Sequence, residues 1–543
     1  MPLSIPASIL KKTVGTELAQ TRQYLNLREE DGDVETDISH LSEESIKELI
    51  AVATEEKNSK MVRTLESLLS AYEGDFEKPV PNHDAFSEIL IKYLRSDLID
   101  GWIYVEERDG KRYPELVTSI QRIPADRRAG SPAQVILRTA RLTCTTRRGD
   151  GEYSQDFRGH VFTPADVTRK RVLDILNNQK IRHETPELRE EYLSSMKRFK
   201  SLVRDRFSEQ FIFTGKIFKH EKRYHLEGYS ERKVIHDVES DVYRTKVDFV
   251  ESILFKGSSD GMDSGVIPDH PHVRVFDLKT HESYWVHADF LSPYEYDLTL
   301  REKIVLPPTH RDLLDILTTD LSSFTGDIID GKTAGNIILC KGIPGVGKTL
   351  TAEIYSELIQ KPLYSIHSGS LGTAASSIEG NLSKIFNRSQ RWGCVILLDE
   401  ADVFVSKRKE NIETNAIVAE FLRTLEYFSG LLFMTTNRPD DIDEAIISRC
   451  AAIIDYAPPS PKDAAKIWEI MSENFGAGLD REMIGGLVDL FPEIAPRDIK
   501  MVLRLVLKMH HGRQEPITLD LFRKCAMFRA VKMAGEVNTR RDQ

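Results

Sequence analysis

The feature that most constrains this chain is the octapeptide at residues 342–349, which reads G-x-x-x-x-G-K-T. It follows the apolar run of residues 336–340, a pattern typical of a buried strand, and residues 350–355 after it have helical spacing. Glycines let a backbone approach a polyphosphate closely, and the N–H groups at the start of a helix favour bound anions. The sequence therefore predicts a strand, a phosphate-binding loop and a helix.

Two side chains at the end of this loop have the chemistry that a nucleotide needs. We expect Lys348 to reach the β- and γ-phosphates of ATP, and the Thr349 hydroxyl to ligate Mg²⁺. The complete nucleotide-binding set that we predict is Gly342, Pro344, Gly345, Val346, Gly347, Lys348, Thr349 and Leu350.

A second apolar run, residues 394–398, ends in the acidic pair Asp399 and Glu400. The carboxyl end of a buried parallel strand lies at the sheet edge where ligands bind. We expect Asp399 to hold Mg²⁺ there, and Glu400 to polarise the water that attacks the γ-phosphate. Thr349 and Asp399 are thus the predicted metal ligands.

Three further residues are candidates for catalytic roles. Asn437 ends a third apolar run, residues 430–436, so it is expected to sense the γ-phosphate or its water. Arg449 closes a short helix and is expected to stabilise transition-state charge at a neighbouring subunit's nucleotide. Arg497 follows Pro496 at the start of a helix and is expected to contact the γ-phosphate from a lid. Taken alone, each also fits a structural role.

Composition limits the class of protein. A chain of 543 residues is too long for one core, so we expect two to four domains. The formal charge of −11 argues against a generally basic surface for nucleic acid. The five cysteines contain no C-x-x-C pair, which favours a reducing, cytoplasmic location. No window is apolar enough for a membrane span, so no membrane partner is expected.

The pattern along the chain predicts four parts. Residues 1–75 have helical periodicity, and residues 76–296 alternate short β-type runs with turns, with a charged helical insertion. A nucleotide-binding core is expected at residues 297–460 and a helical lid at residues 461–543. Within the β-rich part, seven arginines between Arg122 and Arg148 could contact nucleic acid, although a solvated face is the simpler interpretation.

Taken together, these motifs resemble those of the AAA+ ATPases. Residues 342–349 and 395–400 correspond to Walker A and Walker B, Asn437 to sensor 1, Arg449 to the arginine finger and Arg497 to sensor 2. Residues 363–373, 401–408 and 421–428 resemble a less-studied group, best known from large fungal proteins with an uncharacterised β-rich domain before the ATPase. The resemblance implies a P-loop doubly wound parallel sheet with a C-terminal helical lid, preceded by a β-rich α+β domain.

The resemblance also implies a Mg²⁺-dependent ATPase that assembles as a homo-oligomeric ring, most often a hexamer, and remodels or disassembles a protein complex. Two departures bear on its client. Residues 369–375 lack the aromatic residue of peptide-threading relatives, and the triplet Ser448, Arg449, Cys450 is similar to that of clamp loaders. There are therefore two alternative functions. One is an ATP-gated assembly on nucleic acid, and the other is a nucleotide switch that binds ATP and barely hydrolyses it. The intact Glu400 and Arg449 argue against the switch.

Overall fold

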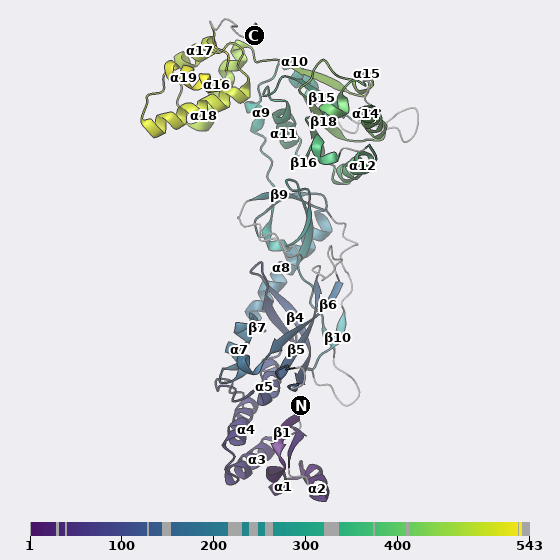
Figure 1. The fold of residues 1–543 in the computed structure, drawn as a ribbon, viewed down its shortest axis with the longest axis vertical. Helices are drawn as coiled ribbons and strands as arrows, with labels where there is room; N and C mark the ends of the chain where they lie inside the picture. Colours follow the sequence, from purple (N-terminus) through teal and green to yellow (C-terminus); the bar gives the residue numbers. More distant parts are fainter. Residues whose placement is uncertain are drawn as a thin grey trace.

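The computed structural model describes residues 2–28, 32–38, 41–126, 130–143, 154–215, 231–237, 248–255, 264–319, 336–372, 375–408, 412–529 and 531–534. The molecule is elongated, with the N-terminal helices at one end and the α/β core and its lid at the other (Figure 1). Two β-sheets lie between these ends, one beyond the other. Among the described residues, no helix is long and apolar enough to cross a membrane.

The N-terminal end is a helical module closed by a small hairpin. Its elements are β1 (Pro2–Pro6), α1 (Ala7–Lys12), α2 (Ala19–Arg28), β2 (Asp33–Asp37), α3 (Glu43–Glu55), α4 (Ser59–Tyr72) and α5 (His83–Arg95). Ser42, Asn58 and Asn82 begin the last three helices, because each side chain accepts a backbone N–H of the first turn. Helices α3 and α4 each bury one apolar face, as the helical periodicity of residues 1–75 predicts. Helix α5 lies in the part expected to be β-rich and is buried over most of its length.

A five-stranded antiparallel sheet, which we call the arm sheet, follows this module. Its order is β6-β5-β4-β3-β7, with strands β3 (Trp102–Glu106), β4 (Arg112–Ile123), β5 (Gln134–Thr143), β6 (Ser154–Phe162) and β7 (Ile181–His183). Helices α6 (Pro164–Val167) and α7 (Val172–Asn178) connect β6 to β7. One hydrophobic core runs from Leu3 to Ile181 and includes Leu254, so it crosses the boundary that we expected between residues 75 and 76.

The expected single β-rich part contains a second sheet, the junction sheet, beside the α/β core. Its order is β13-β12-β9-β8-β14, with β8 (Gln210–Phe213), β9 (Arg232–His236), β12 (His272–Asp277), β13 (Ser283–His287) and β14 (Leu291–Pro293). The 20-residue helix α8 (Pro186–Asp205) leads from the arm sheet to it, and a two-stranded hairpin of β10 (Phe249–Glu251) and β11 (Ser264–Val266) precedes β12. The 3-10 turn η2 (Ala288–Phe290) separates β13 from β14.

Arginines of the stretch between Arg122 and Arg148 take structural positions in the arm sheet. Arg122 is paired with Asp84 of α5, and Arg141 is buried against Glu107 and Glu115. Arg138 is exposed on β5. Four others, Arg127, Arg128, Arg147 and Arg148, lie outside the described residues. Two of the three described arginines are therefore already neutralised by carboxylates, which supports a structural role for this pair.

A cluster of buried histidines joins the arm sheet to the junction sheet. The Tyr113 ring of β4 lies against His270, His272 and His287, at centroid distances of 4.6, 5.0 and 5.5 Å. The Tyr113 hydroxyl donates to Asp109 (2.5 Å) and lies 3.0 Å from Nε2 of His272. All three imidazoles are at most 3% exposed. Neutral rings are required here, because burial disfavours an imidazolium.

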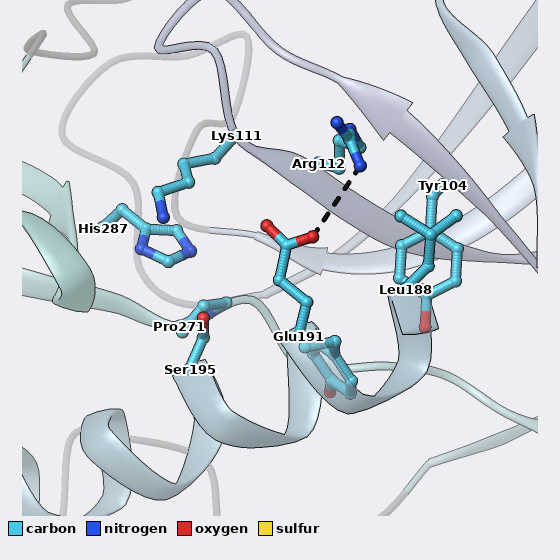
Figure 2. A pocket seen from close by; sticks show the side chains of 9 residues that line it. Tyr104, Lys111, Arg112, Leu188, Glu191, Ser195, Pro271 and His287 are labelled. Carbon is cyan, nitrogen blue, oxygen red and sulfur yellow. Dashed lines mark ion pairs between the residues drawn. The ribbon is translucent and has the colours of Figure 1, made fainter. Parts of the chain in front are cut away.

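A small cavity borders this joint where α8 crosses it (Figure 2). Lys111 and His287 face it from the two sheets, and Ser195 faces it from α8. Asp289 holds these elements together, because its carboxylate accepts from Lys111 (2.7 Å) and Ser195 (2.8 Å). Arg112 and Glu191 form an ion pair across the same cavity, with 3.7 Å between them. The joint thus combines these polar contacts with a shared hydrophobic core, in which Tyr104 and Leu116 of the arm sheet belong to the same cluster as Phe211 and Val273 of the junction sheet.

The core is a doubly wound α/β sheet of five parallel strands in the order β16-β17-β18-β15-β19. The strands are β15 (Asn336–Gly342), β16 (Leu363–His367), β17 (Val395–Asp399), β18 (Leu431–Thr436) and β19 (Ala452–Tyr456). The accompanying helices are α9 (Leu300–Lys303), α10 (Pro308–Thr319), α11 (Lys348–Leu358), η3 (Ser368–Leu371), α12 (Ala375–Trp392), α13 (Asp402–Val405), α14 (Ile412–Leu425) and α15 (Glu444–Ile447). This is the predicted P-loop fold.

The lid is a separate helical unit with its own core around Trp468 and Phe522. It consists of α16 (Pro461–Phe475), α17 (Arg481–Leu490), α18 (Pro496–Arg513) and α19 (Leu519–Met527). Proline occupies the first turn of α16 and α18, where its missing N–H leaves no hydrogen bond broken. In Figure 1 the lid and the helices α12, α14 and α15 lie on opposite sides of the core sheet.

The cluster of buried histidines predicts that the free energy of unfolding of the arm sheet falls when the pH is lowered from 7 to 5.5. Burial lowers the pKa of His270 to about 3 and that of His287 to about 4, and it also lowers the pKa of His272. Each folded-state pKa lies below the unfolded value near 6.5, so the unfolded chain binds protons first and the stability present at pH 7 is lost as pH falls. We expect a loss of about 1 kcal/mol per histidine at pH 5.5.

Urea unfolding followed by tryptophan fluorescence measures this effect, since Trp102 of β3 and Trp285 of β13 contribute to the signal from the two joined sheets. His270→Asn serves as a second variant, since it should be less stable at pH 7 and should lose less stability between pH 7 and 5.5. An unfolding free energy of the wild type that is the same at both pH values would contradict the assignment.

Candidate nucleotide site

The phosphate-binding loop leaves β15 and enters α11 through three glycines with positive φ angles, Gly342 (144°), Gly345 (88°) and Gly347 (105°). At Gly342 a Cβ atom would lie 2.2 Å from the Tyr456 carbonyl oxygen of β19, so only glycine fits. At Gly345 a Cβ atom would lie 2.9 Å from the Cβ of Arg497. The loop conformation therefore depends on glycine for two reasons, the backbone angles and the close packing.

Lys348 is held at the carboxyl edge of the core sheet. Its side chain is 6% exposed, and its Nζ donates to the carbonyls of Gly342 and Ile343 (both 2.8 Å) and to Oδ1 of Asn437 (2.9 Å). Burial lowers the pKa of this lysine below its ordinary value. Lys348 and Asn437, predicted from separate motifs, are thus in direct contact.

Asp399 is the centre of a second set of hydrogen bonds. Its Oδ1 accepts from the Thr349 hydroxyl (2.9 Å) and from the Thr435 hydroxyl of β18 (2.5 Å). Thr435 in turn accepts the backbone N–H of Glu400 at 3.0 Å. Glu400 has a φ of 54°, a left-handed conformation that is uncommon for a residue with a side chain and is found often at functional sites.

The oxygen pair of Thr349 and Asp399 fits Mg²⁺. Magnesium prefers hard oxygen ligands and usually keeps several waters beside one or two protein ligands and substrate phosphates. Among the described residues, no group of three or more His, Cys, Asp or Glu side chains could hold a metal by itself. A metal at this pair would therefore need a phosphate and water to complete its coordination.

Two residues with supporting positions were not singled out from the sequence. Oδ1 of Asp402 accepts from the Thr436 hydroxyl (2.6 Å) and from the backbone N–H of Asn437 (3.0 Å), and so fixes the strand end that carries Asn437. Thr435 bridges Asp399 and Glu400 as described above. Their positions in the sequence could have indicated these two residues, because Asp402 lies two residues after Glu400 and Thr435 two residues before Asn437.

The remaining predicted residues lie at different places. Arg497 begins the lid helix α18, is exposed, and its backbone N–H donates to the Gly345 carbonyl (3.1 Å), so the lid contacts the phosphate loop. Arg449 follows α15, where its guanidinium donates to the Ala445 carbonyl (3.1 Å) and pairs with Glu426. Because α15 and the lid lie on opposite sides of the core, these two arginines are on different faces (Figure 1).

A cleft of about 850 Å³ lies beside α11, between this helix, the junction sheet and the lid. Leu350, one turn into α11, lies on its wall with a 48% exposed side chain, and Met471 of α16 lies on the wall formed by the lid. Pro344 and Val346 are the other predicted members of the loop. Of the segment expected to hold an aromatic in threading relatives, residues 373–374 lie outside the described residues.

Comparison with known proteins agrees with this geometry. Residues 338–457 match the family described as ATPase family associated with various cellular activities (AAA). ATPase family AAA domain-containing protein 3 of Caenorhabditis elegans is 27% identical over 172 residues, which cover 30% of this chain and 28% of the relative. Fidgetin-like protein 1 of Drosophila melanogaster is 28% identical over 180 residues, which cover 31% and 34% respectively.

Among solved structures, a FIGL-1 AAA domain in complex with ADP is 20% identical, with a TM-score of 0.35 over 43% of this chain and 84% of that one. The chain matches only about a third or less of the length of the two curated relatives. The family match falls on residues 338–457, which include most of β15 and the strands β16 to β19. The chain therefore carries, within residues 338–457, an ATPase domain of the AAA family.

Proposed function

We propose that this protein binds Mg²⁺-ATP at the carboxyl edge of the core sheet, hydrolyses it, and uses the cycle within a ring of identical subunits to remodel a protein complex. The observation that supports hydrolysis is the continuous set of hydrogen bonds from Thr349 through Asp399 and Thr435 to Glu400. This set holds the metal-binding oxygens and the candidate base in one fixed arrangement, as phosphoryl transfer requires.

Each residue then has a separate role in the reaction. Mg²⁺ held by Thr349 and Asp399 would neutralise charge on the phosphates. The Lys348 ammonium, now held by backbone carbonyls and Asn437, would exchange these partners for phosphate oxygens. Glu400 would accept the proton of the attacking water, and Asn437 would orient that water.

The role of a neighbouring subunit rests on the position of Arg449. This arginine follows α15. In Figure 1 this helix lies across the core sheet from the lid, which supports a contact of Arg449 with a second subunit rather than with its own phosphate loop. Arg497, by contrast, belongs to the lid helix that contacts Gly345 and would close over the phosphates. Ring assembly, with a hexamer as the expected size, would therefore complete each site.

The client is proposed to be a protein. The nucleic-acid alternative rests on the clamp-loader-like triplet at Arg449 and on the arginines between Arg122 and Arg148, and of these arginines Arg122 and Arg141 are engaged by Asp84, Glu107 and Glu115. The formal charge of −11 likewise argues against a generally basic surface. The N-terminal module and arm sheet are the proposed client-binding parts.

Replacing Lys348 with alanine should abolish binding of Mg²⁺-ATP, because the buried ammonium is the group that faces the phosphates. Titration of a fluorescent ATP analogue measures the effect, with a weakening of at least about a hundredfold expected from the loss of a charge-assisted contact. Lys384→Ala removes an exposed lysine of α12 and should bind as the wild type does. Tight ATP binding by Lys348→Ala would show that the site is wrongly assigned.

Replacing Arg449 with alanine should leave ATP affinity unchanged and lower the steady-state turnover at least about tenfold, because a trans-acting arginine stabilises only the transition state. Arg481→Ala, an exposed arginine of the lid, is the matched control. Phosphate release is measured across a range of protein concentrations. Wild-type activity should rise with concentration, and full activity in Arg449→Ala would refute the role.

The client is tested with Glu400→Gln, which should bind ATP without hydrolysing it. The variant is used to capture partners from native extract with and without ATP, and Lys348→Ala combined with Glu400→Gln is the control that lacks nucleotide. Discrete polypeptides enriched only with ATP are expected. Recovery of nuclease-sensitive nucleic acid in their place would contradict a protein client and favour the alternative assembly on nucleic acid.

A further inference from the structure

The far end of the phosphate-loop helix is tied to the junction sheet through one carboxylate. Glu357, in the last turn of α11, has a side chain only 12% exposed. Its Oε1 accepts from the Tyr294 hydroxyl (2.5 Å) and from Nζ of Lys233 in β9 (2.9 Å), and its Oε2 accepts the backbone N–H of Asp297 (3.1 Å). We call Glu357, Lys233 and Tyr294 the clamp.

The members of the clamp also bind one another. Lys233 donates to the Tyr294 hydroxyl (2.6 Å), and its ammonium lies 4.3 Å from the centroid of the Tyr294 ring. Although burial opposes it, hydrogen bonding to Tyr294 and Glu357 raises the pKa of Lys233 above its ordinary value. Such a partly buried, charge-assisted network is stronger and more specific in geometry than an isolated surface ion pair.

Two further contacts fix the junction sheet to the end of α12. The Asp237 carboxylate, 8% exposed, pairs with Arg391 and accepts the Trp392 indole N–H at 2.7 Å. The buried Phe276 of β12 packs against Trp392, with ring centroids 4.9 Å apart, and belongs to the same hydrophobic cluster as the core strands. The junction sheet is therefore anchored to the core at both helices, and lies directly below it in Figure 1.

The clamp borders an open space, since Lys233 and Glu357 are among the residues that line the cleft. The cleft described above separates this helix and the junction sheet from α16, with Leu278, Glu353 and Met471 on its three walls. A lid can therefore move relative to the helix without breaking the clamp. An α-helix of 11 residues is about 16 Å long and moves as a rod, so a displacement at Lys348 and Thr349 reaches Glu357.

We propose that Glu357 is a positioning residue that couples the nucleotide site to the N-terminal arm through the clamp. This proposal rests on the nucleotide site proposed above. Nucleotide held at the start of α11 shifts the helix, and Glu357 passes this shift to β9 and to the chain at Tyr294, which leads back to β14. Because coupling between two sites is reciprocal, release of the clamp also changes nucleotide affinity by the same free energy.

Hydrogen exchange of the full-length chain, with and without Mg²⁺ and a non-hydrolysable ATP analogue, tests the coupling. In the wild type, the analogue is expected to change exchange in β9 and β14. Glu357→Ala should still bind the analogue, with an affinity altered about fivefold or more, and its β9 and β14 exchange should no longer respond. Glu493→Ala, which removes an exposed glutamate between α17 and α18, is the control and should respond as the wild type does.

A second variant keeps the test independent of folding. Lys233→Met removes the ammonium that the junction sheet contributes to the clamp, and should likewise abolish the response of β9 and β14 exchange to the analogue. Lys233→Glu combined with Glu357→Lys restores an ion pair and should recover part of that response. An unchanged response in both Glu357→Ala and Lys233→Met would overturn the proposal, as would an equal loss in Glu493→Ala. A wild type that fails to bind the analogue at all would instead contradict the nucleotide site itself.

Discussion

The hydrogen bond between Lys348 and Asn437 depends on the parallel alignment of neighbouring strands, and the rest of the site depends on that alignment too. Strand β15 delivers the phosphate loop, β18 delivers Asn437 and Thr435, and β17 delivers Asp399 and Glu400. Because these three strands are adjacent and parallel, their carboxyl ends meet at one edge. A chain with any of these strands reversed would carry the same residues but not the same site.

At this edge of the sheet, polar side chains hydrogen bond to one another and to the backbone. Lys348 is paired with carbonyl oxygens, Asp399 with two hydroxyls, and Asp402 with a hydroxyl and a backbone N–H. Buried polar groups of this kind stabilise a fold only when each is hydrogen bonded, so the site is preorganised before a ligand arrives. Arg449, bonded to Glu426 and a carbonyl, is held outside this network at another face of the subunit.

Contacts of a different kind connect the core to the junction sheet and the junction sheet to the arm sheet. Aromatic packing of Phe276 with Trp392 and the carboxylates of Asp237 and Glu357 fix the junction sheet to the core. By contrast, the junction sheet meets the arm sheet through neutral histidines around Tyr113, where burial lowers the pKa of each imidazole. The contact between the junction sheet and the core is suited to transmit movement. The stability of the contact between the junction sheet and the arm sheet depends on pH.

The sequence by itself determined the nucleotide fold and predicted most of the candidate site, because the motifs are local. Gly342, Lys348 and Thr349 lie in one octapeptide, and the pair Asp399 and Glu400 and the single Asn437 follow short apolar runs that indicate buried strands. Only the tertiary structure decided the rest. The second sheet, the core that crosses residues 75–76, the supporting role of Asp402, and the clamp of Lys233, Tyr294 and Glu357 all depend on contacts between residues distant in the chain. Such contacts have no fixed spacing, so no local pattern of residue types can predict them.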